Sequence, residues 1–156
     1  MILIGKVDIA APAGTVFHSI TDIETLSILA RRRGVVLRRT DGAPEEGMVS
    51  PGMTWDADFR FRGKDRHMDA EVTRLIAPDE MAFRAVSRGF EITVTTQVVA
   101  LAAIRSRLLV TLEARPRTLG ARLLLQSARL GQSGLEARFQ QRIDAYGKTI
   151  EAPVRA

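Results

Sequence analysis

Cysteine is absent from this 156-residue chain, and the only histidines are His18 and His67. The lack of thiols excludes disulfide bonds, cysteine nucleophiles, iron–sulfur clusters and zinc sites built from thiolates. Long apolar runs are also missing, because the longest, residues 98–104, is far shorter than the ~20 residues that cross a bilayer. Too few apolar residues precede Lys6 for a secretory signal. We therefore expect a cytoplasmic protein without integral membrane association.

The residues that are present are those of an ordinary globular domain, with 46% hydrophobic and 26% charged residues. A chain of this length can bury one sizeable core, so we expect a single domain over residues 1–156. The net charge is +5, and lysine occurs only at positions 6, 64 and 148, so 20 of the 23 cationic residues are arginine. Five of these arginines fall within residues 31–39, but no aromatic residue alternates with them for base stacking. We expect no nucleic-acid partner.

The apolar residues follow the periods of strands and helices in a definite order. Residues 2–9 read as a strand, and residues 13–29 as two short helices, the second capped by Asp22. Residues 35–39 form a second short strand, and from residue 53 to 115 apolar and polar residues alternate in strands separated by turns. Residues 119–150 are helical in composition, with a kink or break expected between Gly131 and Gly134.

The turns of the 53–115 region set a register in which one face of an antiparallel sheet stays apolar. Folding the chain about Gly63 places Ala57 opposite Ala70, and folding it about residues 77–80 places Val72 opposite Ala85. The three alanines then form a strip of small side chains across three strands. Either bulky helix residues fill the space above that strip, or a ligand cavity lies there.

Three short segments and the amphipathic terminal helix carry a resemblance to a known family. The segments are residues 9–13 (Ile-Ala-Ala-Pro-Ala), the Val16-Phe17 pair with Ile20 and Asp22, and residues 52–55 (Gly-Met-Thr-Trp). With the element order, they resemble the helix-grip fold of the SRPBCC or START-like superfamily, which includes polyketide cyclase/dehydrase-like and birch-pollen-allergen-like proteins. The resemblance implies an α+β fold in which a curved antiparallel sheet of about six or seven strands wraps around a long C-terminal helix. It also implies a cavity between sheet and helix that in relatives holds apolar small molecules.

We expect the ligand, a hydrophobic or amphipathic small molecule that is lipid- or polyketide-like, to contact the apolar face of the sheet. The predicted ligand-binding residues are Trp55, Ala57, Phe59, Met68, Ala70, Arg74, Phe83, Ala85, Ser87, Phe90 and Thr96. Among them Arg74, Ser87 and Thr96 are the polar groups that would orient the ligand. No catalytic residue, metal ligand or cofactor-binding residue is assigned.

Two alternatives remain open at this stage. A cyclase- or dehydrase-type enzyme would need a titratable group in the cavity, for which Arg74, Tyr146 and His18 are the candidates. An interaction module would use the basic residues 31–39, with a homodimer through a sheet edge as one form of it. The acids of the outer face, Asp56, Asp58, Asp69 and Glu71, are expected to form a ladder of ion pairs with neighbouring arginines rather than a metal site, and His67 is expected opposite Arg60.

Overall fold

A computed structural model describes residues 1–44 and 46–151. The elements in chain order are β1 (Ile2–Ile9), α1 (Ala13–Thr21), α2 (Ile23–Arg32), β2 (Val36–Arg39), β3 (Thr54–Phe61), β4 (Lys64–Ile76), β5 (Glu80–Val86), β6 (Phe90–Ala102), β7 (Arg105–Pro116), α3 (Leu119–Arg129) and α4 (Gln132–Glu151). None of the helices in these ranges combines the length and the apolar content that a membrane crossing requires.

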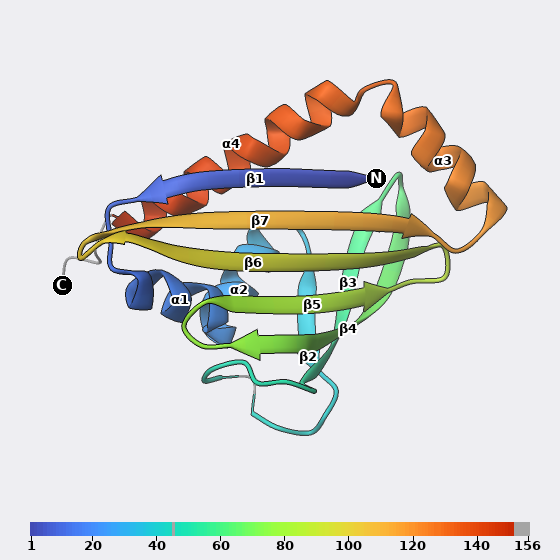
Figure 1. The fold of residues 1–156 in the computed structure, drawn as a ribbon. Coiled ribbons are helices and arrows are strands. Elements are labelled where there is room, and N and C mark those ends of the chain that lie inside the picture. Colours follow the sequence, from blue (N-terminus) through green and yellow to red (C-terminus); the bar gives the residue numbers. More distant parts are fainter. Residues whose placement is uncertain (45, 152–156) are drawn as a thin grey trace.

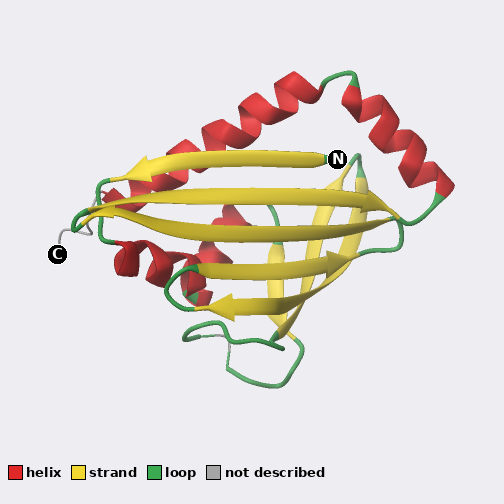
Figure 2. Ribbon diagram, in the orientation of Figure 1, coloured by secondary structure: helices red, strands yellow, loops and turns green. Residues whose placement is uncertain are grey.

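The strands form one antiparallel sheet in the order β1-β7-β6-β5-β4-β3-β2, in which β1 pairs with β7 and forms one edge (Figure 1). Figure 2 shows that α1 and α2 follow β1, and that the helical C-terminal part runs along the β1 edge and beyond. The expected break separates α3 from α4 at Leu130 and Gly131. These features confirm the predicted helix-grip architecture.

Two glycines bring α4 against β1. A Cβ atom built on Gly147 would lie 3.0 Å from a methyl carbon of Val7, and one built on Gly5 would lie 2.9 Å from Cγ1 of Ile143. Such distances are too short for a side chain larger than hydrogen without displacement of its neighbour. The absence of a side chain at both positions therefore sets the distance between helix and strand.

The free edge of β1 is partly covered by a side chain of α4. The Gln140 amide oxygen accepts a hydrogen bond from the Lys6 backbone N–H (3.1 Å), and its amide nitrogen donates to the Lys6 carbonyl (2.7 Å). These are the two bonds that a neighbouring strand would make. The pairing shields a sheet edge that would otherwise offer unpaired backbone groups to another chain.

The register agrees with the prediction in one half of the sheet. Phe83 pairs with Val94 across β5 and β6, and Val98 pairs with Leu108 across β6 and β7. Both pairs match the expected partners.

The predicted register is wrong by two residues in the β3–β4 hairpin. Phe61 pairs with Lys64 because the turn consists of Arg62 and Gly63 alone, with φ angles of 53° and 73°. Two consecutive residues in the left-handed region make the tight turn that matches the twist of a hairpin. The apolar face is preserved, but Ala57 now pairs with Met68 and not with Ala70.

The predicted register of the β4–β5 pair is also wrong. Val72 pairs with Phe83 rather than with Ala85, and the register then shifts between Val72 and Arg74. A β-bulge of this kind adds one unpaired residue and reverses the facing of all residues beyond it. As a result Leu75 packs in the core, and Ile76 is exposed.

Candidate functional site

The inner face of the sheet, defined here as the face that packs against α1 and α4, is covered unevenly. Where α1 and α4 cover this face, the side chains of Ile9, Val16 and Leu108 are almost completely buried. Residues of α4 such as Phe139 pack against them and are half-buried. A second buried cluster joins Ile23 of α2 to strands β4 and β5. Helices therefore cover the inner face at the end that carries α1, α2 and α4.

The alanine strip has a different cover. Ala57 and Ala85 are buried with Met68, and Ala70 is half-buried beside them. The hydrophobic residues that complete this cluster are Val35, Leu37, Phe59 and Ile92, which come from the sheet and the segment before β2. Within the described part of the chain, no hydrophobic side chain of a helix belongs to it. The hydrophobic cover of the strip therefore comes from the sheet and from Val35.

Four predicted aromatic residues border this region, namely Trp55, Phe59, Phe83 and Phe90. All four side chains are only partly buried, although they belong to the apolar face of the sheet. Trp55 and Phe83 pack at the edge of the second cluster, and Phe59 packs at the edge of the alanine cluster. The structure therefore brings most of the predicted apolar residues together as one partly exposed surface.

The predicted hydroxyl groups are already engaged within the protein. Thr96 is buried and donates a hydrogen bond to the Met81 carbonyl (3.0 Å). The Ser87 hydroxyl lies at the β5–β6 turn and accepts a hydrogen bond from the Phe90 backbone N–H (3.1 Å). Among the described residues, every buried polar side-chain atom has a partner. A ligand on this surface would therefore meet mainly apolar and aromatic groups.

The prediction for Arg74 is wrong. Its side chain is 61% exposed and forms an ion pair with Glu80, in which Nε lies 2.9 Å from Oε2. Strict alternation places Arg74 on the apolar face, but the bulge in β4 turns it to the outer face. Arg74 cannot orient a ligand on the inner face.

Sequence reasoning missed Arg39 as the cation of this region. Its guanidinium lies 5.4 Å from the centre of the Trp55 ring, and only 4% of the side chain is exposed. Nε and Nη2 donate to both carboxylate oxygens of Asp41, at 2.8 and 2.7 Å. These hydrogen bonds lower the pKa of Asp41 to about 2. Strand alternation in β2 is the signal that could have found Arg39, because this residue pairs with Trp55 of β3.

The burial of Arg39 also shortens the basic segment proposed as an interaction surface. Arg38 of the same strand pairs with Asp56 (3.2 Å) and Asp58 (3.6 Å). Only residues 31–33, at the end of α2, remain as exposed neighbouring arginines.

A polar pair lies where α1 meets α4. The Tyr146 and Ser19 hydroxyls are 2.7 Å apart. Burial raises the pKa of the Tyr146 phenol, and the hydrogen bond with Ser19 opposes that effect. The phenol is therefore neutral at physiological pH. Of the three groups considered for acid–base chemistry, Tyr146 alone is half-buried, whereas His18 and Arg74 are exposed.

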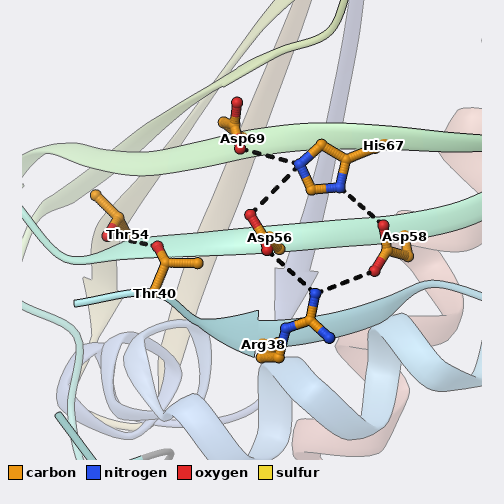
Figure 3. Close-up of polar contacts among 7 residues, drawn as sticks. All are labelled: Arg38, Thr40, Thr54, Asp56, Asp58, His67 and Asp69. Carbon is orange, nitrogen blue, oxygen red and sulfur yellow. Dashed lines mark hydrogen bonds and ion pairs between the residues drawn. The ribbon is translucent and has the colours of Figure 1, made fainter. Parts of the chain in front are cut away.

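His67 lies on the outer face in a network of carboxylates (Figure 3). It pairs with Asp58 rather than with the expected Arg60, since the register differs by two residues. Nδ1 is 2.8 Å from Asp58, and Nε2 is 3.0 Å from Asp69 and 3.4 Å from Asp56. The hydrogen bonds with Asp58 and Asp69 raise the pKa of His67.

The same register sets the neighbours of the acids on the outer face. Asp56 lies opposite Asp69, and Glu71 lies opposite Thr54. Asp56, His67 and Asp69 present ligand atoms within 4.8 Å of one another, close enough to surround a single cation. Arg38 supplies positive charge to Asp56 and Asp58 from β2, and the raised pKa of His67 favours the charged imidazole beside the three carboxylates. The arrangement is a surface ion-pair network in which Arg38 and His67 are the cationic partners of these aspartates.

Two hollows lie away from the inner surface. One, of about 310 Å³, is lined by Trp55 and Ala70 together with Thr40, Thr54, Asp69, Glu71, Arg84 and Val86, most of which belong to the outer face. The other, of about 490 Å³, lies beside the β4–β5 turn and is lined by residues such as Asp79 and Gln97. Neither contains the predicted aromatic residues other than Trp55.

Comparison with known proteins rests on three-dimensional structure. No family model and no curated protein sequence matches the chain. The Zhui aromatase/cyclase of Streptomyces sp. R1128 superimposes with a TM-score of 0.68 at 14% identity, covering 100% of this chain and 96% of that one. Norcoclaurine synthase of Thalictrum flavum superimposes with a TM-score of 0.65 at 12% identity, covering 100% and 89%. A START superfamily protein of Mycobacterium smegmatis gives 0.54 at 16% identity, covering 90% and 97%. Together with the sheet order and the long terminal helix, these similarities show that the chain has the helix-grip fold.

Proposed function

We propose that this chain binds a hydrophobic or amphipathic small molecule, lipid- or polyketide-like, on the inner face of its sheet above Ala57, Ala70 and Ala85. The observation that carries the proposal is the alanine cluster without a hydrophobic cover from a helix. Apolar surface left partly exposed in this way gains free energy when a ligand removes it from water, at about 25 cal/mol per Å².

The surroundings of the alanine strip support an apolar or aromatic ligand. Aromatic rings border the strip, and the nearby hydroxyl groups of Ser87 and Thr96 already have partners. A ligand rich in hydrogen-bonding groups would lose its bonds with water and find few replacements. The structurally similar norcoclaurine synthase was solved with dopamine and hydroxybenzaldehyde, which are small aromatic molecules. That precedent supports an aromatic ring in the ligand here.

The first test uses the single tryptophan of the chain, because Trp55 borders the proposed site. The apolar dye 1-anilinonaphthalene-8-sulfonate is titrated into the protein, and energy transfer from Trp55 measures its binding. We expect saturable binding to the folded protein and loss of transfer on unfolding. In parallel, native and denatured masses of the protein purified from cells would identify a non-covalent ligand that accompanies it.

Ala70→Leu is the variant that locates the site. Ala57 and Ala85 are already buried, so leucine there would overpack the cluster and destabilise the fold. Ala70 is half-buried between them, and leucine at this position projects into the proposed ligand space. We expect Ala70→Leu to weaken dye binding at least about tenfold, the effect of a lost apolar contact of this size.

Ala137→Leu is the matched control, because residue 137 is exposed on α4. It should bind the dye as the unmodified protein does, and both variants should keep the circular dichroism spectrum of a folded chain. Undiminished dye binding by a folded Ala70→Leu protein would show that the ligand site lies elsewhere.

A further inference from the structure

Helix α3 has two apolar faces on opposite sides. At 3.6 residues per turn, the residues that turn toward the sheet are Ala121, Leu124, Leu125 and Ala128, which are buried or half-buried. The opposite side carries Leu119, Leu123 and Leu130, whose exposed fractions are 72%, 57% and 91%. We call these three residues the outer leucine stripe. An amphipathic helix of a globular protein normally exposes a polar face, so the stripe is an unpartnered apolar surface.

Helix α3, which carries the stripe, extends beyond the end of the strands. Figure 1 shows α3 as a separate arm at an angle to α4, and Leu130 sits at the turn between the two helices. The hairpin of β6 and β7 is at the other end of the molecule in the same view. A flat partner can therefore reach the stripe without contacting the rest of the domain first.

Helix α3 itself carries arginines and no acidic residue. Residues 114–135 contain four arginines, at positions 115, 117, 122 and 129, and no acidic residue. Arg122 and Arg129 are exposed on one flank of the stripe, and neither forms an ion pair within the described residues. Long arginine side chains can lie along an apolar surface and place their charge at its border.

We propose that α3 is a docking helix for a lipid surface that carries anionic headgroups. Leucines on one side flanked by cations are the composition with which short amphipathic helices lie in a bilayer interface. At 11 residues α3 is too short to cross a bilayer, so it would lie in the plane of the headgroups. A second copy of the chain fits the stripe less well, because two such helices would bring arginines together without an acidic partner. The proposal does not rest on the ligand site, which lies on the inner face.

The experiment is flotation of the unmodified protein with vesicles of phosphatidylcholine, alone or mixed with phosphatidylglycerol. We expect binding to the anionic vesicles that decreases with added salt, and weak binding to neutral ones. Replacing Arg122 and Arg129 together by glutamine should lower the partition coefficient about 30-fold, from about tenfold per 1.4 kcal/mol and about 1 kcal/mol for each arginine near the surface. Replacing Leu123 and Leu130 by serine should lower it at least about tenfold.

Two controls match these variants elsewhere on the surface. Ile104→Ser removes an apolar side chain that is 72% exposed in the β6–β7 hairpin. Arg31→Gln with Arg32→Gln removes two exposed cations of α2. Both should leave vesicle binding near that of the unmodified protein, and all variants replace exposed residues and should remain folded.

Three results would overturn the proposal. The first is no binding to vesicles of either composition. The second is binding that the α3 variants leave unchanged, or that the Arg31 and Arg32 control lowers equally. The third is a dimer in light scattering that dissociates on replacement of Leu123 and Leu130, since a second copy would then occupy the stripe. Dye binding by the α3 variants is measured separately, so failure here leaves the ligand-site test untouched.

Discussion

Single residues decide which side of the sheet carries charge. Arg39 and Arg74 both come from alternating strands, yet one is buried over Trp55 and the other is exposed beside Glu80. Alternation predicts facing correctly as long as the strand is regular, which holds for Arg39 in β2. It fails for Arg74, because a bulge depends on how two strands pair and leaves no mark in the sequence of either one.

The pH dependence of stability provides a test of the His67 network. The pKa of His67 is raised in the folded state, mainly by the hydrogen bonds with Asp58 and Asp69. A raised pKa means that the contribution to stability is fully present below the unfolded value of about 6.5 and is lost as the pH rises through the folded value. We therefore expect the melting temperature of the unmodified protein to exceed that of His67→Gln most at pH ~5.5, and least at pH ~8.5.

Nuclear magnetic resonance gives the pKa of His67 directly. The chain has two histidines, so the signals missing from the His67→Gln spectrum identify the His67 ring. The titration midpoint of His67 should lie above 6.5 in the unmodified protein. In the Asp58→Asn variant the midpoint should be lower. A difference in melting temperature between the unmodified protein and His67→Gln that increases with pH would contradict this network.

At the scale of elements, the contact between α4 and β1 depends on a missing side chain. A Cβ atom at position 147 would lie 3.0 Å from Val7, whereas one at position 134 of the same helix would meet nothing within 4 Å. We expect Gly147→Ala to lower the free energy of unfolding by about 1–3 kcal/mol through overpacking. Gly134→Ala should raise it by about 0.5–1 kcal/mol, because alanine favours a helix interior. Urea unfolding of the two variants measures the difference, and equal effects would mean that α4 does not pack tightly on β1.

The cover of the β1 edge by Gln140 can be tested with its neighbour as control. Gln140→Ala removes both side-chain bonds to the Lys6 backbone, so exchange of the Lys6 amide proton should accelerate. The unfolding free energy should fall by about 1 kcal/mol, the usual net value of such a bond. Gln141→Ala, at an exposed position of the same helix, should change neither quantity. Unchanged Lys6 exchange in Gln140→Ala would show that water replaces the glutamine without loss.

The elements themselves were predictable, whereas part of their register was not. Amphipathic periods and turn residues indicate every strand from 53 to 115 and the break in the terminal helix. The β3–β4 register depends on whether the turn uses two residues or four, and a left-handed Arg62 decides for two. Since arginine rarely adopts that conformation, the sequence favours the longer turn. A shift by two residues keeps the apolar face intact, so the predicted apolar residues still share one face despite the wrong register.

At the scale of the whole molecule, architecture follows from element order, but the placement of the terminal helices does not. The amphipathic stripe of residues 119–150 predicts one cover for the sheet. In the structure α4 packs along β1, and α3 projects beyond it with Ala121 as its buried residue. The reason is the break at Leu130 and Gly131, which separates the apolar stripe of α3 from that of α4. The partly exposed alanine cluster and the outer leucine stripe both follow from that separation.

A designed disulfide tests whether α3 controls access to the inner face. A Cβ atom at Gly89 would lie 3.6 Å from that of Ala121, within the range of about 3.5–4.5 Å that disulfides require. Because the chain has no cysteine of its own, Gly89→Cys with Ala121→Cys can form one defined bond, which joins α3 to the β5–β6 turn. The bond should raise the free energy of unfolding by about 3–4 kcal/mol relative to the reduced form.

The effect on dye exchange follows from the position of that bond. It fixes the start of α3 beside Phe90, one of the aromatic residues that border the proposed site. If a ligand enters and leaves between α3 and the sheet, oxidation should slow dye release while leaving the equilibrium number of binding sites unchanged. Stopped-flow fluorescence measures the rate at which the dye leaves the protein in the presence of an excess of a competing ligand. The same sample is measured before and after reduction. Equal rates in the oxidised and reduced forms would mean that the entrance does not involve α3, and that its leucines serve the outer surface alone.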